Sequence, residues 1–272
     1  GLVGSEMCIR DSIHETAFTG FGESVTIFED FLNDFPNSQY ADKVNDYLVE
    51  VYLTTKNYEA ALKSINKIKH PSTKILEAKQ DILFQLGTQA FANVKLDDAV
   101  SLFSQAIQLG SYNMEARNDA YFWRGESYYR MGEYENAISD YRTYLNNTRQ
   151  HNTDMYALAY YNLGYSYFKL RDYSAALNRF RQYVDLESNR QAASLADAYN
   201  RIGDCLYQNR QFSLAEENYS RAAQLSPSAG DYSIYQKGFL LGLQKDYKGK
   251  ISAMDRLISE YPESQYVDDA LF

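Results

Sequence analysis

Apolar residues recur along most of this chain with the spacing of amphipathic helices. In the segment YALAYYNLGYSYFKL, one face of a helix collects positions i, i+3, i+4 and i+7, which are Tyr160, Leu163, Gly164 and Tyr167. The next segment, DYSAALNRFRQYVDL, shows the same spacing. Between the two segments the pattern breaks at Arg171-Asp172, and Asp172 can cap the second helix. The pattern therefore predicts two short antiparallel helices joined by a tight turn.

This helix pair recurs at nearly regular intervals. A glycine marks the first helix of five copies, at Gly87, Gly125, Gly164, Gly203 and Gly238. Twelve residues after each of the first four glycines comes an alanine, at Ala99, Ala137, Ala176 and Ala215. An aromatic residue follows each alanine four residues later. We expect these small residues to let the two helices of a pair approach closely, because a bulky side chain there would overpack the contact.

The repeated unit resembles the tetratricopeptide repeat (TPR), whose pattern is W-x2-L-G-x2-Y…A-x3-F…P. The best matches are NDAYFWRGESYYRMGEYENAISDYRTYL and SLADAYNRIGDCLYQNRQFSLAEENYSRAAQLSP, the second closing on Pro227. Two copies depart from the pattern, since Val49 occupies the glycine column and Lys250 the alanine column. The resemblance implies an all-α fold, a right-handed α-solenoid of stacked antiparallel helix pairs, in which the first helix of each pair lines a concave face.

The repeats predict the domain organisation. We expect a single solenoid over residues 13–272, with a half repeat at 21–34, repeats at about 42–72, 80–110, 118–148, 157–187, 196–226 and 231–261, and the start of another at 267–272. Residues 1–12, GLVGSEMCIRDS, show no periodicity and resemble a translated sequencing adapter. We expect them to be an unstructured artefact, with a natural coil as the alternative. Both ends are interpreted as cuts through a longer protein.

Two joints between repeats are near copies of each other, FPNSQYADK from Phe35 and YPESQYVDD from Tyr261. Proline ends one helix and serine can cap the next, so a structural role accounts for both joints. The joints are also similar to those of bacterial cell-envelope repeat proteins. That resemblance favours the periplasm or cell envelope over the cytoplasm, and the compartment stays open.

Aromatic residues are abundant, with 26 Tyr, 14 Phe and 1 Trp. Tyrosine suits surfaces that meet both water and a ligand. The TPR resemblance places a partner-binding groove on the outward positions of the first helices, at Phe122, Glu126, Tyr129, Arg130, Tyr161, Tyr165, Phe168, Asn200, Asp204 and Tyr207. Packing between neighbouring first helices is the alternative for each ring. The Lys and Asn columns with which some family members hold a C-terminal carboxylate carry other residues here, so no such clamp is expected.

The remaining residues point away from catalysis. The formal charge of -9 disfavours nucleic acid, and no apolar run is long enough to cross a bilayer. No metal-ligand spacing occurs: His14, His70 and His151 are isolated, and Cys205 is expected to be a buried thiol. The pairs Asp97-Asp98 and Glu216-Glu217 are placed at the starts of second helices, where acids favour the helix dipole.

The sequence therefore predicts a non-enzymatic scaffold, without metal or cofactor, that binds a protein or peptide segment in an aromatic groove. The alternative is a cell-surface carbohydrate-binding repeat protein, because exposed rings can also stack on sugars; a glycan array would separate the two. Self-association stays open, and an enzymatic role would need a catalytic domain outside this sequence. Fold alone does not decide between these functions.

Overall fold

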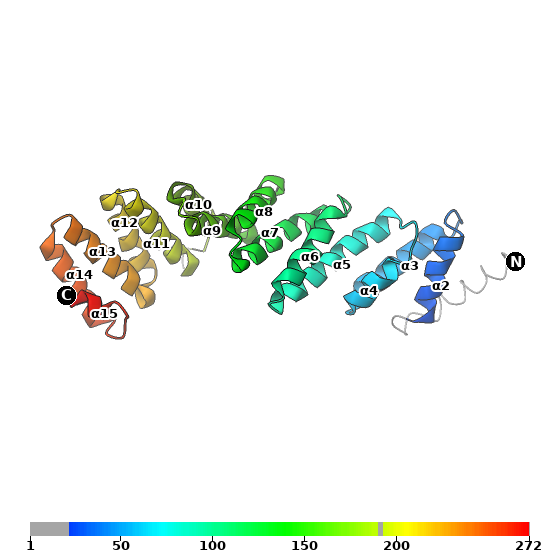
Figure 1. Cartoon of the computed structure of the whole chain (residues 1–272), viewed down its shortest axis with the longest axis horizontal. Coiled ribbons are helices and arrows are strands. Elements are labelled where there is room, and N and C mark those ends of the chain that lie inside the picture. Colours follow the sequence, from blue (N-terminus) through cyan, green and yellow to red (C-terminus); the bar gives the residue numbers. More distant parts are fainter. Residues whose placement is uncertain (1–21, 190–192, 272) are drawn as a thin grey trace. The chain divides into compact units, whose positions relative to one another are not determined.

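In the computed structural model, which describes residues 22–189 and 193–271, the regular elements are all helical (Figure 1). The predicted all-α class with stacked helix pairs is therefore confirmed. The chain divides into two compact units, an N-terminal unit that ends at Met131 and a C-terminal unit that begins at Gly132. A single array over residues 13–272 stays a prediction, and the adapter-like residues 1–12 lie outside the described residues.

The N-terminal unit is built on two apolar clusters. Its helices are α2 (Glu23–Asp34), α3 (Ala41–Thr54), α4 (Tyr58–Ile65), α5 (Thr73–Ala92), α6 (Leu96–Gln108) and α7 (Met114–Met131). The first cluster joins α2 to α5 around Phe28, Tyr52 and Ile82. The second joins α5, α6 and α7 around Phe103, which is fully buried. Each helix thus buries one stripe against the next, as the spacing of apolar residues requires.

The C-terminal unit continues the same arrangement. It contains α8 (Tyr134–Asn147), α9 (Asp154–Lys169), α10 (Tyr173–Leu186), α11 (Ala193–Gln208), α12 (Phe212–Leu225), the short 3-10 helix η2 (Pro227–Ala229), α13 (Asp231–Leu243), α14 (Tyr247–Glu260) and α15 (Val267–Ala270). One cluster spans α9 to α13 around Phe180, Ile202 and Tyr219. Another holds α13 and α14 together around Met254 and Leu257.

The glycine column makes room for an aromatic ring. A Cβ atom added at Gly87 would lie 2.5 Å from Phe103, and one at Gly203 would lie 2.6 Å from Tyr219. A Cβ at Gly164 would similarly lie 2.9 Å from Phe180. The expected close approach is therefore present, but the ring four residues after the alanine, and not the alanine itself, fills the space above the glycine.

The last repeat has the same close contact between its two helices, with different residues at the contact. Gly238 faces Met254, which takes the place of the aromatic ring. Lys250 departs from the alanine column, and a Cβ added at Gly242 would lie 3.1 Å from its side chain. In the preceding copy the position of Gly242 is held by Tyr207. A larger residue on one helix is thus matched by a smaller one on the other.

In five of the tight turns between paired helices, one residue has the left-handed conformation. It lies seven residues after the marker glycine, at Val94, Gly132, Arg171, Arg210 and Lys245, with φ between 59° and 82°. In four of these turns the next residue donates its N–H to a carbonyl five residues back, as from Asp172 to Tyr167 at 3.0 Å. This is the bond pattern of a helix end that usually selects glycine at the left-handed position, yet only Gly132 supplies one.

Local capping is partly as expected. Asp172 caps α10, since its Oδ1 accepts the N–H of Ala175 at 3.0 Å. The serines of the two joints do not cap the following helices, which is a correction. Ser38 Oγ instead accepts the N–H of Tyr40, and Ser264 Oγ that of Tyr266, both at 3.3 Å. The chain turns once more before α3 and α15 begin, so the serine lies too early to reach their first N–H groups.

Candidate functional site

Four of the predicted groove residues lie on α7 in the N-terminal unit. Phe122 is only 2% exposed and packs edge-on against Trp123, so the outward position expected for it does not hold. Arg130 forms an ion pair with Glu126 at 3.1 Å and lies 4.3 Å above the ring of Phe91. Tyr129 is half-buried. This surface is mainly occupied by contacts within the unit.

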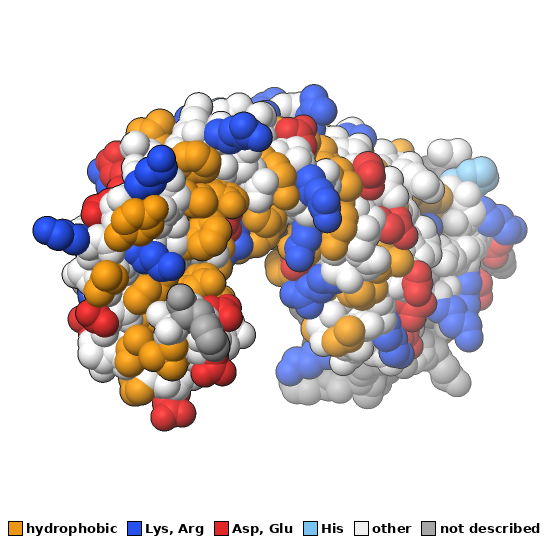
Figure 2. All heavy atoms as spheres, turned by 60° about the vertical axis from the view of Figure 1, so that its left-hand side comes forward, with side chains coloured by type: hydrophobic (Ala, Val, Ile, Leu, Met, Phe, Trp, Pro, Cys, Tyr) orange, Lys and Arg blue, Asp and Glu red, His pale blue; other side chains and the backbone are white. Residues whose placement is uncertain are grey.

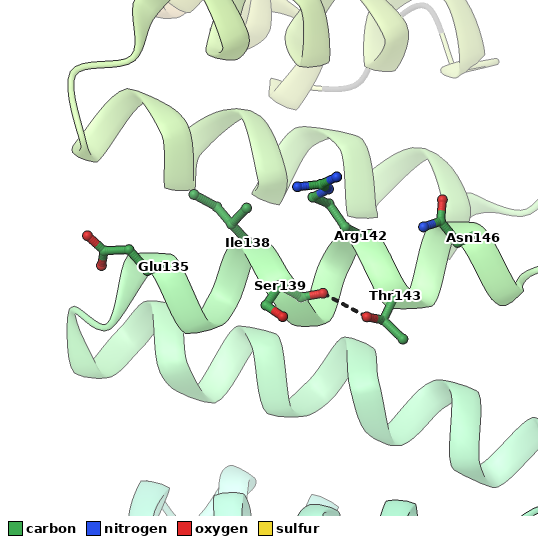
Figure 3. A pocket seen from close by; sticks show the side chains of 6 residues that line it. All are labelled: Glu135, Ile138, Ser139, Arg142, Thr143 and Asn146. Atoms are coloured by element: carbon green, nitrogen blue, oxygen red, sulfur yellow. Dashed lines mark hydrogen bonds between the residues drawn. The ribbon is translucent and has the colours of Figure 1, made fainter.

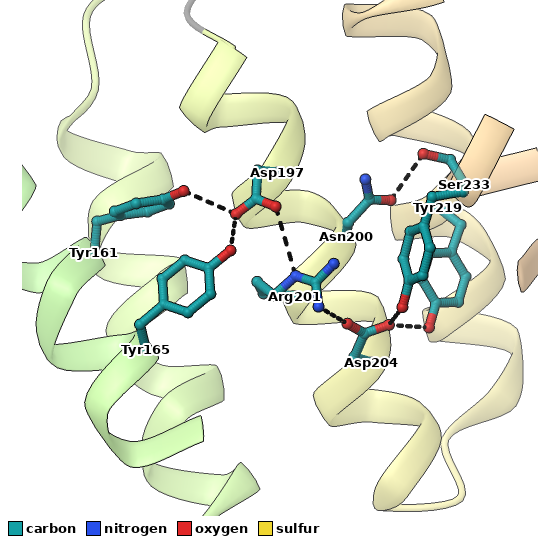
Figure 4. Close-up of polar contacts among 9 residues, drawn as sticks. Tyr161, Tyr165, Asp197, Asn200, Arg201, Asp204, Tyr219 and Ser233 are labelled. Atoms are coloured by element: carbon teal, nitrogen blue, oxygen red, sulfur yellow. Dashed lines mark hydrogen bonds and ion pairs between the residues drawn. The ribbon is translucent and has the colours of Figure 1, made fainter. Parts of the chain in front are cut away.

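In the C-terminal unit, two predicted tyrosines converge on one carboxylate (Figure 4). Tyr161 and Tyr165 of α9 both donate their hydroxyl protons to Asp197 Oδ2 of α11, Tyr161 at 2.8 Å. Their rings pack edge-on, with centroids 5.0 Å apart, and Tyr161 also contacts Tyr183 of α10. Burial raises the pKa of both phenols above its ordinary value, so they remain donors. These tyrosines join α9 to α11.

A second carboxylate on α11, that of Asp204, contacts two tyrosine hydroxyls and one guanidinium group. Asp204 accepts hydrogen bonds from Tyr219 of α12 at 2.7 Å and from Tyr232 of α13 at 2.6 Å. Arg201 lies between the carboxylates, 2.7 Å from Asp204 and 3.6 Å from Asp197. Burial raises the pKa of Asp204, while Arg201 and the two phenols oppose that effect. We call these residues the polar clasp: Tyr161, Tyr165, Asp197, Arg201, Asp204, Tyr219 and Tyr232.

The clasp changes the role of several predicted residues. Asp204 and Asn200 are buried, and Asn200 accepts a hydrogen bond from Ser233 of α13 at 2.8 Å. Arg201 was missed by sequence reasoning, although Asp197, Arg201 and Asp204 follow one another at the spacing of helical ion pairs. These polar groups hold α9, α11, α12 and α13 in register, and they already have partners within the unit.

Two hollows lie on the surface of the C-terminal unit. The larger, about 530 Å³, lies beside the clasp and is lined by Asp197, Asn200, Arg201, Tyr232, Tyr266, four alanines and Ser226. The other, about 340 Å³, lies along α8 alone, where Thr143 Oγ1 donates to the Ser139 carbonyl at 2.9 Å (Figure 3). Side chains from a single helix make that surface shallow, and it brings no reactive groups together.

Apolar side chains remain accessible at the C-terminal ends of three first helices of the C-terminal unit. Phe168 of α9 and Tyr207 of α11 are half-buried, whereas Phe239 and Leu243 of α13 are exposed. The rings of Tyr207 and Phe239 lie 6.2 Å apart. We call these four residues the aromatic strip. Phe168 and Tyr207 are two of the predicted groove residues, and their rings remain accessible in the structure.

Groups that could support catalysis are dispersed in the described part of the chain. No cluster of His, Cys, Asp and Glu there could hold a metal ion. Cys205 is buried, as expected, and burial raises the pKa of its thiol to about 12. His151 stacks on Tyr156 with centroids 4.6 Å apart.

The paired acids have separate structural roles. Asp97 and Asp98 occupy the first turn of α6, as predicted. Glu216 lies beyond the first turn of α12 and pairs with Lys237 at 3.4 Å, so its predicted placement at a helix start is wrong. Across residues 22–189 and 193–271, no helix combines the length and hydrophobicity that crossing a bilayer would need.

Asp119 on α7 predicts a pH dependence of stability. Burial, and secondarily the charge of Glu115, raise its pKa to about 6, above the value of about 3.9 for an unfolded chain. The folded chain therefore binds the proton more tightly, and this contribution to stability is present below pH ~4 and lost as the pH rises through ~6. We expect Asp119→Asn to stabilise the chain by roughly 1–2 kcal/mol at pH 7.5 and by much less at pH 4.

Urea unfolding followed by circular dichroism at the two pH values measures this difference. Asp185→Asn, at an exposed position of α10, serves as the matched control. An equal stability difference at both pH values for Asp119→Asn would contradict the raised pKa.

Comparison with known proteins identifies the repeated unit. Sequence profiles of the tetratricopeptide repeat match residues 116–186, 161–230 and 232–264. A search of curated protein sequences gives no match.

Solved structures show the same fold. The chain is similar to YrrB, described as a TPR protein with an unusual peptide-binding site, at 19% identity and a TM-score of 0.60, over 72% of this chain and 95% of that one. It is similar to MamA at 17% identity and a TM-score of 0.58, over 68% and 92%. The C-terminal part of a TPR repeat-containing protein from Cytophaga hutchinsonii matches at 16% identity and a TM-score of 0.53, over 100% of both chains. At these identities the likeness concerns the fold alone.

Proposed function

Because the chain belongs to the tetratricopeptide-repeat family, we propose that it is a non-enzymatic scaffold that binds a segment of another protein along the aromatic strip of its C-terminal unit. The observation that carries this proposal is the accessible apolar strip across α9, α11 and α13. Accessible rings on a rigid support are typical anchors of protein interfaces. The clasp supplies that support by joining the same helices.

Two further observations support a protein or peptide as the ligand. A solved structure of similar fold is described as having a peptide-binding site. Helix pairs in register also present an extended surface that a helix or an extended strand of a partner can follow. Location in a bacterial cell envelope is part of the same proposal and rests on the two joints at Phe35 and Tyr261.

The strip is tested with peptides selected from a random display library against the whole chain. We expect Tyr207→Ala with Phe239→Ala to weaken binding of the selected peptides by at least about tenfold, since each ring is an anchor. These residues are better targets than Tyr161 and Tyr165, whose loss would also disturb the clasp. Leu186→Ala with Leu214→Ala, at exposed sites on the second helices α10 and α12, is the matched control.

Equal loss in both double variants would argue against the strip. Selection of no peptide, together with binding to members of a glycan array, would favour the carbohydrate-binding alternative and overturn the proposal. Circular dichroism of each variant shows whether the helices are retained.

A further inference from the structure

A row of basic side chains runs beside the aromatic strip. Arg171, Arg210 and Lys245 hold the left-handed positions of the three turns that join α9 to α10, α11 to α12 and α13 to α14. Their backbone N–H groups donate to backbone carbonyls at the end of the preceding helix, from Arg171 to Phe168 at 3.0 Å and from Arg210 to Tyr207 at 2.9 Å. Each turn repeats the same geometry, so the three bases follow the strip in a fixed register. We call them the basic row.

The basic row does not serve the fold. All three side chains are exposed, and none of them forms an ion pair with another described residue. The left-handed conformation is costly for any residue with a Cβ atom, and Gly132 shows that the same turn forms with glycine. Glycine would therefore adopt the left-handed conformation at each position at a lower cost in free energy. Val94 holds the same left-handed position in the turn between α5 and α6, so the turn itself does not require a base. The exposed charges of the three bases therefore remain available to a partner outside the unit.

Around α13, charge is divided between the two edges of the helices. Lys169 and Lys248 add to the basic row at the turn edge, while the acids there, Asp172 and Asp246, accept N–H groups of the following helices. The opposite edge, at the loops that lead into α13 and α15, carries Asp231, Glu263, Asp268 and Asp269. Figure 2, in which this unit is turned forward, shows basic side chains projecting among hydrophobic ones. At the α13 end of the strip, a ligand thus meets opposite charges on its two sides.

We propose that the strip and the basic row together bind an acidic apolar protein segment, one in which apolar residues are flanked by Asp or Glu. The apolar residues contact the strip and the acids pair with the basic row, turned away from the acidic edge. This inference rests on the proposed function and names the chemistry of its partner. Charge complementarity selects this occupant. A nucleic acid carries phosphates along its whole length and would also place them against the acidic edge at Asp231, Glu263, Asp268 and Asp269.

Synthetic peptides test this proposal by fluorescence anisotropy with the full chain. The probe is a peptide of about ten alternating Leu and Glu residues, which spans roughly 33 Å when extended. Leu-Lys and Ser-Glu peptides of equal length separate the charge from the apolar contribution. We expect the Leu-Glu peptide to bind most tightly and to weaken as salt is added, since exposed pairs are screened.

Substitution by glycine distinguishes the basic row from a merely structural feature. In the variant Arg171→Gly, Arg210→Gly, Lys245→Gly, affinity for the Leu-Glu peptide should fall by about tenfold, a few-fold for each exposed pair. The same variant should unfold at a higher urea concentration than wild type, because glycine suits the left-handed positions. The control replaces three exposed bases of the second helices with glutamate, at Arg142, Arg181 and Arg256. This control variant should change the affinity for the Leu-Glu peptide little.

The outcomes are separable. Unchanged affinity in the glycine variant, or equal binding of the Leu-Lys peptide, would overturn the acidic partner while leaving the strip as a binding surface. Tighter binding of a short single-stranded oligonucleotide than of the Leu-Glu peptide would overturn it in favour of nucleic acid. Loss of selected-peptide binding only on mutation outside the strip would overturn the proposed function itself.

Discussion

Asp204→Ala is expected to lower the free energy of unfolding of the C-terminal unit by about 3–5 kcal/mol, the range for breaking a buried ion pair by removing one partner. The substitution leaves the Tyr219 and Tyr232 hydroxyls without the acceptor they share. It also leaves Arg201 with Asp197 alone, at 3.6 Å. Because Asp204 joins α11 to α12 and α13, the loss should appear as earlier urea unfolding of these three helices, followed by circular dichroism and amide hydrogen exchange.

The comparison variant removes both charges. Arg201→Met with Asp204→Leu should recover much of the lost stability, since well-packed apolar residues often replace a buried pair without cost. Tyr219→Phe removes a single hydroxyl and should cost about 1 kcal/mol. If Asp204→Ala cost no more than Tyr219→Phe, the clasp would not hold these helices together as described.

Gly87→Ala is expected to destabilise the N-terminal unit by about 1–3 kcal/mol, although alanine favours helices over glycine by about 1 kcal/mol. The added Cβ would lie 2.5 Å from a ring carbon of Phe103, which is fully buried and cannot move aside freely. Urea unfolding of the full chain, with hydrogen exchange in α5 and α6, measures the effect.

Two controls isolate the steric cause. Gly242→Ala introduces the same group in α13, but the nearest atom belongs to the flexible Lys250 side chain, so the change should be neutral or stabilising. Gly87→Ala combined with Phe103→Leu provides space for the new methyl group and should be more stable than Gly87→Ala alone. Equal destabilisation by Gly87→Ala and Gly242→Ala would point to a backbone requirement for glycine and not to the ring.

Features that depend on neighbours in the sequence were predictable. The helical spacing around Gly164 and the turn at Arg171-Asp172 appear in the structure as α9, α10 and a capped joint. The glycine column also correctly marks close contacts within pairs. The residue that packs against each glycine could not be predicted from the sequence. Ala176 and Phe180 lie one turn apart on the same helix, and only the packing decides which of them fills the space at Gly164.

The site was less predictable for a physical reason. The repeat position predicts that both Phe122 and Phe168 face outward, but Phe122 is buried and Phe168 is half-buried, because their accessibility depends on the surrounding helices. Tyr161 and Asp197 are 36 residues apart, and no local pattern shows that a phenol and a carboxylate from successive helices will meet. Tyr232 likewise reaches Asp204 across 28 residues.

By itself, the sequence determined that this protein is an all-helical array of repeated hairpins, because helical periodicity, turn residues and small-residue columns act over short stretches of chain. Only the tertiary structure decided which polar groups of α11 are consumed in the clasp and which rings and bases remain for a partner. Burial and hydrogen bonding are properties of whole neighbourhoods, and side chains with the same place in the repeat meet different neighbours in each copy.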